Sequence, residues 1–205
     1  MQEYLTIKNS VTVETTIERS RFIASVAPVK SEEEAKAFVD SIRKKFPDAT
    51  HNCYAYIAER GAYSRYSDDG EPSGTAGPPI LDVIKNNSLL DTAIVVTRYF
   101  GGIKLGTGGL TRAYGGVAAH GVFQAGIVKM SMALNCVVDL SYADYGAFSR
   151  LSRPELKVLS VEYGDGVKIS FAIKKSVYNA FNRDFCDIFS GRYELDITGE
   201  EFVGF

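Results

Sequence analysis

The chain has 205 residues, of which 45% are hydrophobic and 23% are charged, and its formal net charge is −2. This composition suits one or two globular domains and excludes a disordered low-complexity chain and a strongly basic nucleic-acid binder. No apolar run approaches the roughly 20 residues of a membrane-spanning helix, and the N-terminus lacks a signal-peptide pattern. Three widely spaced cysteines fit reduced thiols better than disulfides or a zinc site. We therefore expect a soluble cytoplasmic protein that does not contact membranes.

The first part of the chain alternates strand and helix patterns. Ser31 followed by Glu34 is a capping box that starts a helix, and Pro47 ends it. Ala93 to Tyr99 is a run of β-branched and aromatic residues typical of a buried central strand. Small residues on the helix that follows predict that it lies very close to the sheet. In chain order we expect strands at 11–17 and 21–29, a helix at 31–46, a hairpin of strands at 52–59 and 62–67, a loop at 67–79, a short helix at 80–86, a strand at 93–99 and a helix at 109–128.

The remaining residues predict a second unit with the order βαββαβ, which is the ferredoxin-like pattern. We therefore expect an α+β fold with two domains, 1–134 and 135–205. The first carries 15 basic and 14 acidic residues and the second carries 8 and 11, so an anion site belongs to the first. The expected elements of the second are a strand at 134–140, a helix at 142–151, a hairpin of strands at 157–163 and 167–174, a helix at 176–189 capped by Ser176, and a strand at 193–198.

The glycine-dense segment 98–116, which follows the predicted central strand, is the strongest candidate for a functional surface. No Asp or Glu occurs between Thr92 and Val138, so a local positive field is expected there. A helix that begins after such glycines presents unpaired backbone N–H groups to phosphate or carboxylate. The segment matches neither a Walker A loop nor a complete dinucleotide fingerprint, and tight packing alone would explain its glycines about as well. The residues expected to bind phosphate or nucleic acid are Arg98, Tyr99, Gly101, Gly102, Lys104, Gly106, Thr107, Gly108, Gly109 and Arg112.

A second segment, 65–79, is rich in Asp, Ser, Gly and Pro and is expected to form a loop that adjoins the first. Its three carboxylates and three hydroxyls could hold a hard cation through oxygen atoms. Asp and Ser also bond nearby backbone amides in turns, which favours a self-capped loop over a metal site. No metal is expected. The candidate residues of this adjoining loop and its surroundings are His51, Arg65, Tyr66, Ser67, Asp68, Asp69, Gly70, Glu71, Ser73 and Thr75.

Support for catalysis is weak. A general base would have to be His51 or His120, the two histidines of the chain, and neither a nucleophile elbow nor a zinc-protease motif occurs. We assign no catalytic residue and expect no cofactor. Tyrosines on the strands that flank both loops could stack on bases, although each is more typical of a core or sheet position.

Two long segments in the same order resemble the IMPACT/YigZ family. They are Tyr-Ser-Asp-Asp-Gly-Glu-Pro-Ser-Gly-Thr-Ala-Gly at 66–77 and Val-Val-Thr-Arg-Tyr-Phe-Gly-Gly-Ile-Lys-Leu-Gly-Thr-Gly-Gly-Leu-Thr-Arg-Ala-Tyr at 95–114. The upstream segment 51–56 is similar to the same family. The resemblance covers essentially the whole chain, because the bacterial YigZ-like branch has two domains and no RWD domain.

This resemblance implies a first domain of the βαβ type found in the second domain of a ribosomal protein and in GHMP kinases. It implies a C-terminal domain like the ferredoxin-like domains of elongation factor G. It also implies a link to translation control, with RNA or the ribosome as the expected partner and a further protein partner in translation as a possibility. The kinase-inhibiting role of eukaryotic relatives is not carried over, because it uses the RWD domain.

Three functions remain open at this point. The leading one is a non-enzymatic regulator that binds RNA or the ribosome through the glycine-rich surface. The alternative is a Mg²⁺-dependent enzyme that acts on a phosphorylated small molecule or nucleotide, with Asp68, Asp69 or Glu71 holding the metal and His51 acting as a base. Analogy of fold alone is a weak warrant for that activity. The third is a docking module that uses the same loop for an acidic protein.

Overall fold

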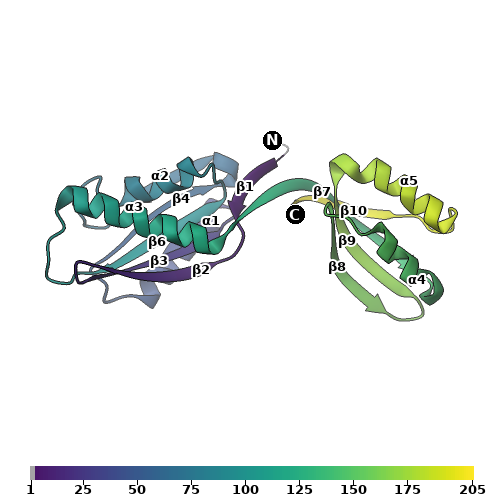
Figure 1. Ribbon diagram of the computed structural model, residues 1–205, viewed down its shortest axis with the longest axis horizontal. Helices are drawn as coiled ribbons and strands as arrows, with labels where there is room; N and C mark the ends of the chain where they lie inside the picture. Colours follow the sequence, from purple (N-terminus) through teal and green to yellow (C-terminus); the bar gives the residue numbers. More distant parts are fainter. Residues whose placement is uncertain (1–2) are drawn as a thin grey trace. The chain divides into compact units, whose positions relative to one another are not determined.

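A computed structural model describes residues 3–205 and divides them into two compact units. One is Tyr4–Val128, and the other is Lys129–Phe205, to which Glu3 also belongs. The predicted boundary between residues 134 and 135 lies inside strand β7 (Ile127–Leu140), which leads from one unit into the other. Both units combine helices with antiparallel sheets, which confirms the α+β prediction (Figure 1).

The first unit is built on a five-stranded sheet with the order β2-β3-β6-β4-β5. β3 and β4 both run antiparallel to β6, which lies between them, so they are parallel to each other. Helix α1 connects them, and the three elements form the βαβ arrangement expected for this domain. The elements are β2 (Val11–Ile17), β3 (Ser20–Pro28), α1 (Glu32–Lys45), β4 (His51–Ala58), a 3₁₀ turn (Glu59–Gly61), β5 (Tyr63–Ser67) and β6 (Thr92–Tyr99).

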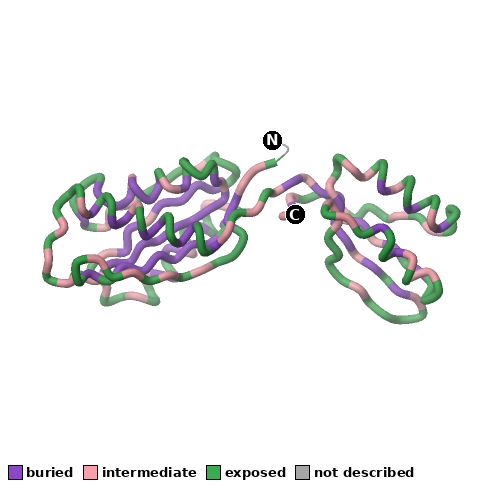
Figure 2. The backbone as a smooth tube through the Cα atoms, viewed as in Figure 1, coloured by how far each residue is buried: buried purple, intermediate pink, exposed green. Residues whose placement is uncertain are grey.

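Helices cover both faces of this sheet. On β4, Ala55 and Ile57 point into the core under α2 (Gly77–Asn86) and α3 (Gly106–Ala125), whereas Tyr56 and Ala58 lie in a smaller cluster with residues of α1. Successive side chains of a strand point to opposite faces, so a strand covered on both sides carries apolar residues throughout. Figure 2 shows the result as continuous burial along the central strands. The predicted buried strand is therefore confirmed in β6, where every residue from Thr92 to Arg98 is buried.

Helix α3 lies against the sheet as closely as its small residues predicted. A Cβ on Gly121 would stand 2.7 Å from Val26 Cγ2 and 3.2 Å from Ala24 Cβ, so only glycine fits there without a shift of the sheet. The helix begins and ends three residues before the predicted limits of 109–128. The loop glycines thus form its first turn, and Gly126, with φ of 70°, ends it before β7. Helix α2 also begins early, because Pro78 and Pro79 are tolerated in its first turn.

The second unit has the strand order β10-β7-β9-β8, with two helices as crossovers, and this is the predicted ferredoxin-like domain. Its core is rich in phenylalanine, since Phe148, Phe171, Phe181, Phe185 and Phe189 are all buried. Strand β1 (Glu3–Ile7), of which only Glu3 belongs to this unit, also pairs with β7. The other elements are α4 (Tyr142–Phe148), a 3₁₀ turn (Ser149–Leu151), β8 (Leu156–Tyr163), β9 (Val167–Lys174), a 3₁₀ turn (Lys175–Val177), α5 (Tyr178–Phe189) and β10 (Asp196–Gly204).

Three predictions for this part of the chain were wrong in detail. Ser176 does not cap α5, because residues 175–177 form a 3₁₀ turn and the helix starts at Tyr178 with no side-chain cap. The last strand covers 196–204 rather than 193–198, and β7 begins seven residues before the predicted position 134. Pairing between β10 and β7 explains both extensions, because residues 200–204 pair with residues 130–134. Within residues 3–205, no helix is both long and apolar enough to cross a membrane.

Candidate anion-binding surface

The glycine-rich segment leaves the sheet through a close contact between two turns. The β2–β3 turn carries Glu18 and Arg19 at positive φ, and it packs directly on Gly101. A Cβ on Gly101 would stand 2.0 Å from the Arg19 carbonyl oxygen, which no side chain tolerates. Ser20 Oγ accepts a hydrogen bond from the Gly101 N–H at 3.2 Å, and this bond fixes where the segment starts.

Arg98, at the end of β6, is an internal group. It is 4% exposed, and its Nη1 donates to Glu71 Oε1 at 2.6 Å while Nη2 donates to Ser20 Oγ at 3.3 Å. Its guanidinium carbon lies 5.4 Å from the ring centroids of Phe22 and Phe100. The charge is neutralised by a carboxylate in contact with it. Arg98 was expected to bind phosphate, and its burial leaves only a small part of the side chain at the surface.

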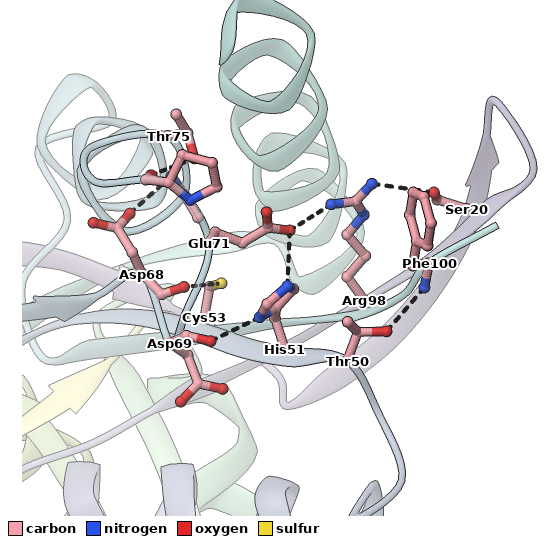
Figure 3. Close-up of polar contacts among 12 residues, drawn as sticks. Ser20, Thr50, His51, Cys53, Asp68, Asp69, Glu71, Thr75, Arg98 and Phe100 are labelled. Atoms are coloured by element: carbon pink, nitrogen blue, oxygen red, sulfur yellow. Dashed lines mark hydrogen bonds and ion pairs between the residues drawn. The ribbon is translucent and has the colours of Figure 1, made fainter. Parts of the chain in front are cut away.

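Glu71 joins the adjoining loop to the glycine-rich segment (Figure 3). Besides Arg98, its Oε1 accepts a hydrogen bond from Tyr114 Oη at 2.7 Å, and His51 Nε2 lies 3.8 Å away. Tyr114 belongs to α3, and burial raises the pKa of its hydroxyl. One carboxylate thus ties together β4, β6, α3 and the 68–76 loop. The predicted adjacency of the two segments depends on this contact.

His51 is held by a hydrogen bond at one ring nitrogen. Its Nδ1 lies 2.8 Å from the Asp69 carbonyl oxygen, which can only accept, so Nδ1 carries a proton and donates. The side chain is 18% exposed, and Gly70 passes close to the ring, with a hypothetical Cβ 3.4 Å from Nδ1. The ring therefore positions the loop against β4.

The loop is largely self-capped. Asp68 Oδ1 accepts from the N–H groups of Ala76 and Gly77 at 2.9 and 2.8 Å, and its Oδ2 accepts from Gly74 at 2.9 Å, so this side chain caps the start of α2. Burial disfavours the Asp68 anion, but the three N–H donors outweigh burial and hold its pKa below the usual value. The other bonds of the loop are Asp69 to the Asn52 N–H and Arg43, Ser67 to the Asp69 N–H, Thr75 to the Pro72 carbonyl and Cys53 to the Asp68 carbonyl.

These contacts bear on the metal alternative. Asp68, Asp69 and Glu71 each already accept hydrogen bonds from donors of the chain itself. Within the described part of the chain, no group of three or more His, Cys, Asp or Glu side chains has an arrangement suited to a metal ion.

The exposed part of the segment is the N-terminus of α3. Leu105 occupies the N-cap position with no side-chain cap, and no acidic residue lies in the first turn. Gly106, Thr107 and Gly108 are exposed, and so are Lys104 just before the helix and Arg112 two turns into it. The first-turn N–H groups and the helix dipole favour an anion at this position.

Two pockets flank this helix start, and Lys104 and Leu105 line both. The first, of about 470 Å³, is lined by Ile17, Glu18, Ile103, Lys104, Leu105, Gly109, Arg112 and Ala113. The second, of about 350 Å³, is lined by Glu71, Pro72, Arg98, Phe100, Lys104, Leu105, Gly106, Thr107 and Leu110. Gly102 and Gly106 have positive φ, and a Cβ at either would meet no atom within 4 Å. Glycine is therefore required at these two positions by the backbone conformation and not by close packing.

Some predicted residues lie apart from this surface. Arg65 stands 3.8 Å from Glu32 at the start of α1, and Tyr66 covers Gly77 of α2. Tyr99 donates through its hydroxyl to Asp48 at 2.9 Å. Ser73 is exposed. Conversely, the sequence analysis missed Ser20, Phe100 and Tyr114. Tyr114 gave the signal of an ordinary core residue of a helix, and nothing in the sequence distinguishes its hydroxyl.

Comparison with known proteins shows to which family this chain belongs. Residues 18–122 match the family model of the Impact N-terminal domain, and residues 138–192 match a domain of unknown function, DUF1949. The IMPACT family member YvyE of Bacillus subtilis (strain 168) is 38% identical over 197 residues, which span 95% of this chain and 91% of that protein. This chain belongs to the IMPACT family. The resemblance stated from the sequence is confirmed.

Another IMPACT protein and one solved structure are similar to this chain over nearly its full length. The IMPACT family member YigZ of Escherichia coli (strain K12) is 34% identical over 199 residues, covering 95% of this chain and 98% of that one. A solved structure of a hypothetical protein matches 97% of this chain with a TM-score of 0.63 and 32% identity, and 98% of that chain is covered. The similarity therefore extends over both units.

Proposed function

We propose that this IMPACT family member is a translation-linked regulator that binds RNA, free or within the ribosome, through the start of α3. The observation that carries the proposal is the uncapped N-terminus of a 20-residue helix, with no acidic residue in its first turn and with Lys104 and Arg112 exposed beside it. Backbone N–H groups, the helix dipole and two exposed cations together form an anion-binding surface. The link to translation rests on the resemblance to the IMPACT family.

The state of the loop carboxylates favours RNA binding over the enzyme alternative. An enzyme that uses Mg²⁺ would draw its ligands from Asp68, Asp69 or Glu71, yet these groups cap a helix, bond β4 and neutralise a buried arginine. Recruiting any of them to a cation would break contacts that hold the loop. RNA needs none of them, because its phosphates require only donors and positive charge.

Replacing both exposed cations tests the proposal. In Lys104→Ala/Arg112→Ala, we expect the affinity for a fluorescein-labelled RNA to fall roughly tenfold at low salt, since two charge-assisted phosphate contacts are lost. Fluorescence anisotropy measures this. The matched control is Lys44→Ala/Lys45→Ala, which removes the same charge from exposed positions at the end of α1.

The control should bind RNA nearly as the native protein does. If the Lys104/Arg112 variant binds RNA as tightly as the native protein, the assignment of this surface as the RNA-binding site is wrong. Binding of an acidic protein to this surface, in place of RNA, would support the docking alternative instead.

A further inference from the structure

Phe100 is an aromatic side chain that the fold holds at the surface. It follows β6 directly and is 46% exposed. Its N–H donates to Thr50 Oγ1 at 3.0 Å, and its ring centroid lies 5.4 Å from the guanidinium carbon of Arg98 (Figure 3). Arg98 in turn is fixed by Glu71 and Ser20. The position of the ring is therefore set by bonds on both its backbone and its neighbour, although the ring contributes little to the core.

The ring and the anion-binding end of α3 line one pocket. The pocket of about 350 Å³ has Phe100 and Arg98 in its wall together with Lys104, Gly106 and Thr107 from the helix start. This volume lies at the small end of the range for ligand pockets, about 300–1,000 Å³. It suits a single unit that carries both an aromatic face and a phosphate.

Arg98 gives a second indication of a ligand. Its Nε is buried with no hydrogen-bond partner, and within residues 3–205 the only other buried side-chain N or O atom in this condition is Asn135 Oδ1. Buried donors in proteins are almost always paired. An unpaired donor on a residue that lines a pocket favours a ligand with acceptor groups, and a nucleotide has such groups on its base, sugar and phosphate.

We infer that this pocket holds one unpaired nucleotide of a single-stranded RNA, with the base stacked on Phe100 and a phosphate at the N-terminus of α3 beside Lys104. The inference rests on the proposed function and specifies its substrate. A base within a duplex is stacked on its neighbours and paired, so its face is not available to Phe100. A single strand offers that face without cost of unpairing. The protein therefore discriminates single-stranded from double-stranded RNA.

The experiment separates stacking from charge with three probes: a labelled single-stranded RNA, the duplex of the same sequence, and inorganic polyphosphate, which has charge and no base. The variants are Phe100→Ala and Phe100→Tyr, and the control is Phe123→Ala, which removes a ring that is 80% exposed near the end of α3. Thermal melting of each variant checks that the fold is kept.

We expect the native protein to bind the single strand at least about tenfold more tightly than the duplex. Phe100→Ala should weaken binding of the single strand about tenfold, as expected for the loss of one base–aromatic stack. It should leave polyphosphate binding unchanged. Phe100→Tyr, which keeps an aromatic face, should stay within about threefold of the native protein, and Phe123→Ala should not differ from it.

Each other result has a distinct meaning. If Phe100→Ala binds the single strand normally while Lys104→Ala/Arg112→Ala does not, the stacking inference is overturned and the proposed function stands. Equal loss of RNA and polyphosphate in Phe100→Ala, or equal affinity of the native protein for duplex and single strand, also overturns it. If the native protein binds no RNA at all, the proposed function fails and the inference fails with it.

Discussion

At the residue scale, the buried pair of Arg98 and Glu71 determines how the surface is held. The side chains are 5% and 4% exposed, and their contact of 2.6 Å joins the end of the central strand to the adjoining loop. Removing one partner of such a pair leaves a buried charge without compensation, which costs about 3–5 kcal/mol. The pair is therefore a structural requirement for the exposed site nearby.

Glu71→Gln should lower the free energy of unfolding by about 3 kcal/mol, because the glutamine cannot neutralise Arg98. Urea denaturation measures the change. Tyr114→Phe, which removes one neutral donor to the same oxygen, should cost only about 1 kcal/mol. The control Glu162→Gln, on exposed β8, should change stability by less than about 0.5 kcal/mol. A small effect for Glu71→Gln would show that Arg98 does not depend on this carboxylate.

Asp68 predicts a dependence of stability on pH. Its pKa is lowered in the folded state, so the stabilisation is fully present above the unfolded-state pKa of about 3.9 and is lost as the pH falls through the folded pKa. Asp68→Asn should therefore be less stable than the native protein by about 1 kcal/mol at pH 7, the cost of a weakened helix cap. The difference in stability between the variant and the native protein should narrow below about pH 4. A difference in stability that stays constant between pH 7 and pH 3 would show that the charge of Asp68 does not stabilise the fold.

At the element scale, α3 combines two uses of glycine. Gly106 starts the helix at positive φ, whereas Gly121 lets it approach β3. Such a helix has poor intrinsic propensity and is stabilised by its buried face. Burial of that face orients the N-terminus toward the loop that follows β6.

Alanine at two positions of α3 should distinguish these uses. Gly116→Ala, where a Cβ meets nothing within 4 Å, should raise stability by about 1 kcal/mol through helix propensity. Gly121→Ala places a methyl group 2.7 Å from Val26 Cγ2, and overpacking should outweigh that gain, with a net loss of about 1 kcal/mol. Thermal melting of the two variants measures both changes in stability. If both variants gained stability, the close approach of α3 to the sheet would be wrong.

At the scale of the whole molecule, local patterns predicted most elements and both fold types. The capping box of Ser31, the apolar run of β6 and the βαββαβ order depend on neighbouring residues, and the structure confirms them. Residues 199–204 of β10 and the first half of β7 were missed because pairing between distant segments forms them. At the site, charge and glycine content pointed to the segment 98–116, but a sequence does not show which cation is buried. Arg98 and Lys104 look alike in the sequence, and only the fold pairs Arg98 with Glu71.

The salt dependence of RNA binding tests the central claim most directly. The affinity of the native protein and of Lys104→Ala/Arg112→Ala is measured for one single-stranded RNA across a series of salt concentrations. The account predicts a steep fall of the native affinity with salt, and a slope of log affinity against log salt that is shallower by about 1.4 in the variant, since each phosphate contact to a single strand contributes about 0.7. Identical slopes for the two proteins would contradict the account, because they would show that these side chains do not contact phosphate.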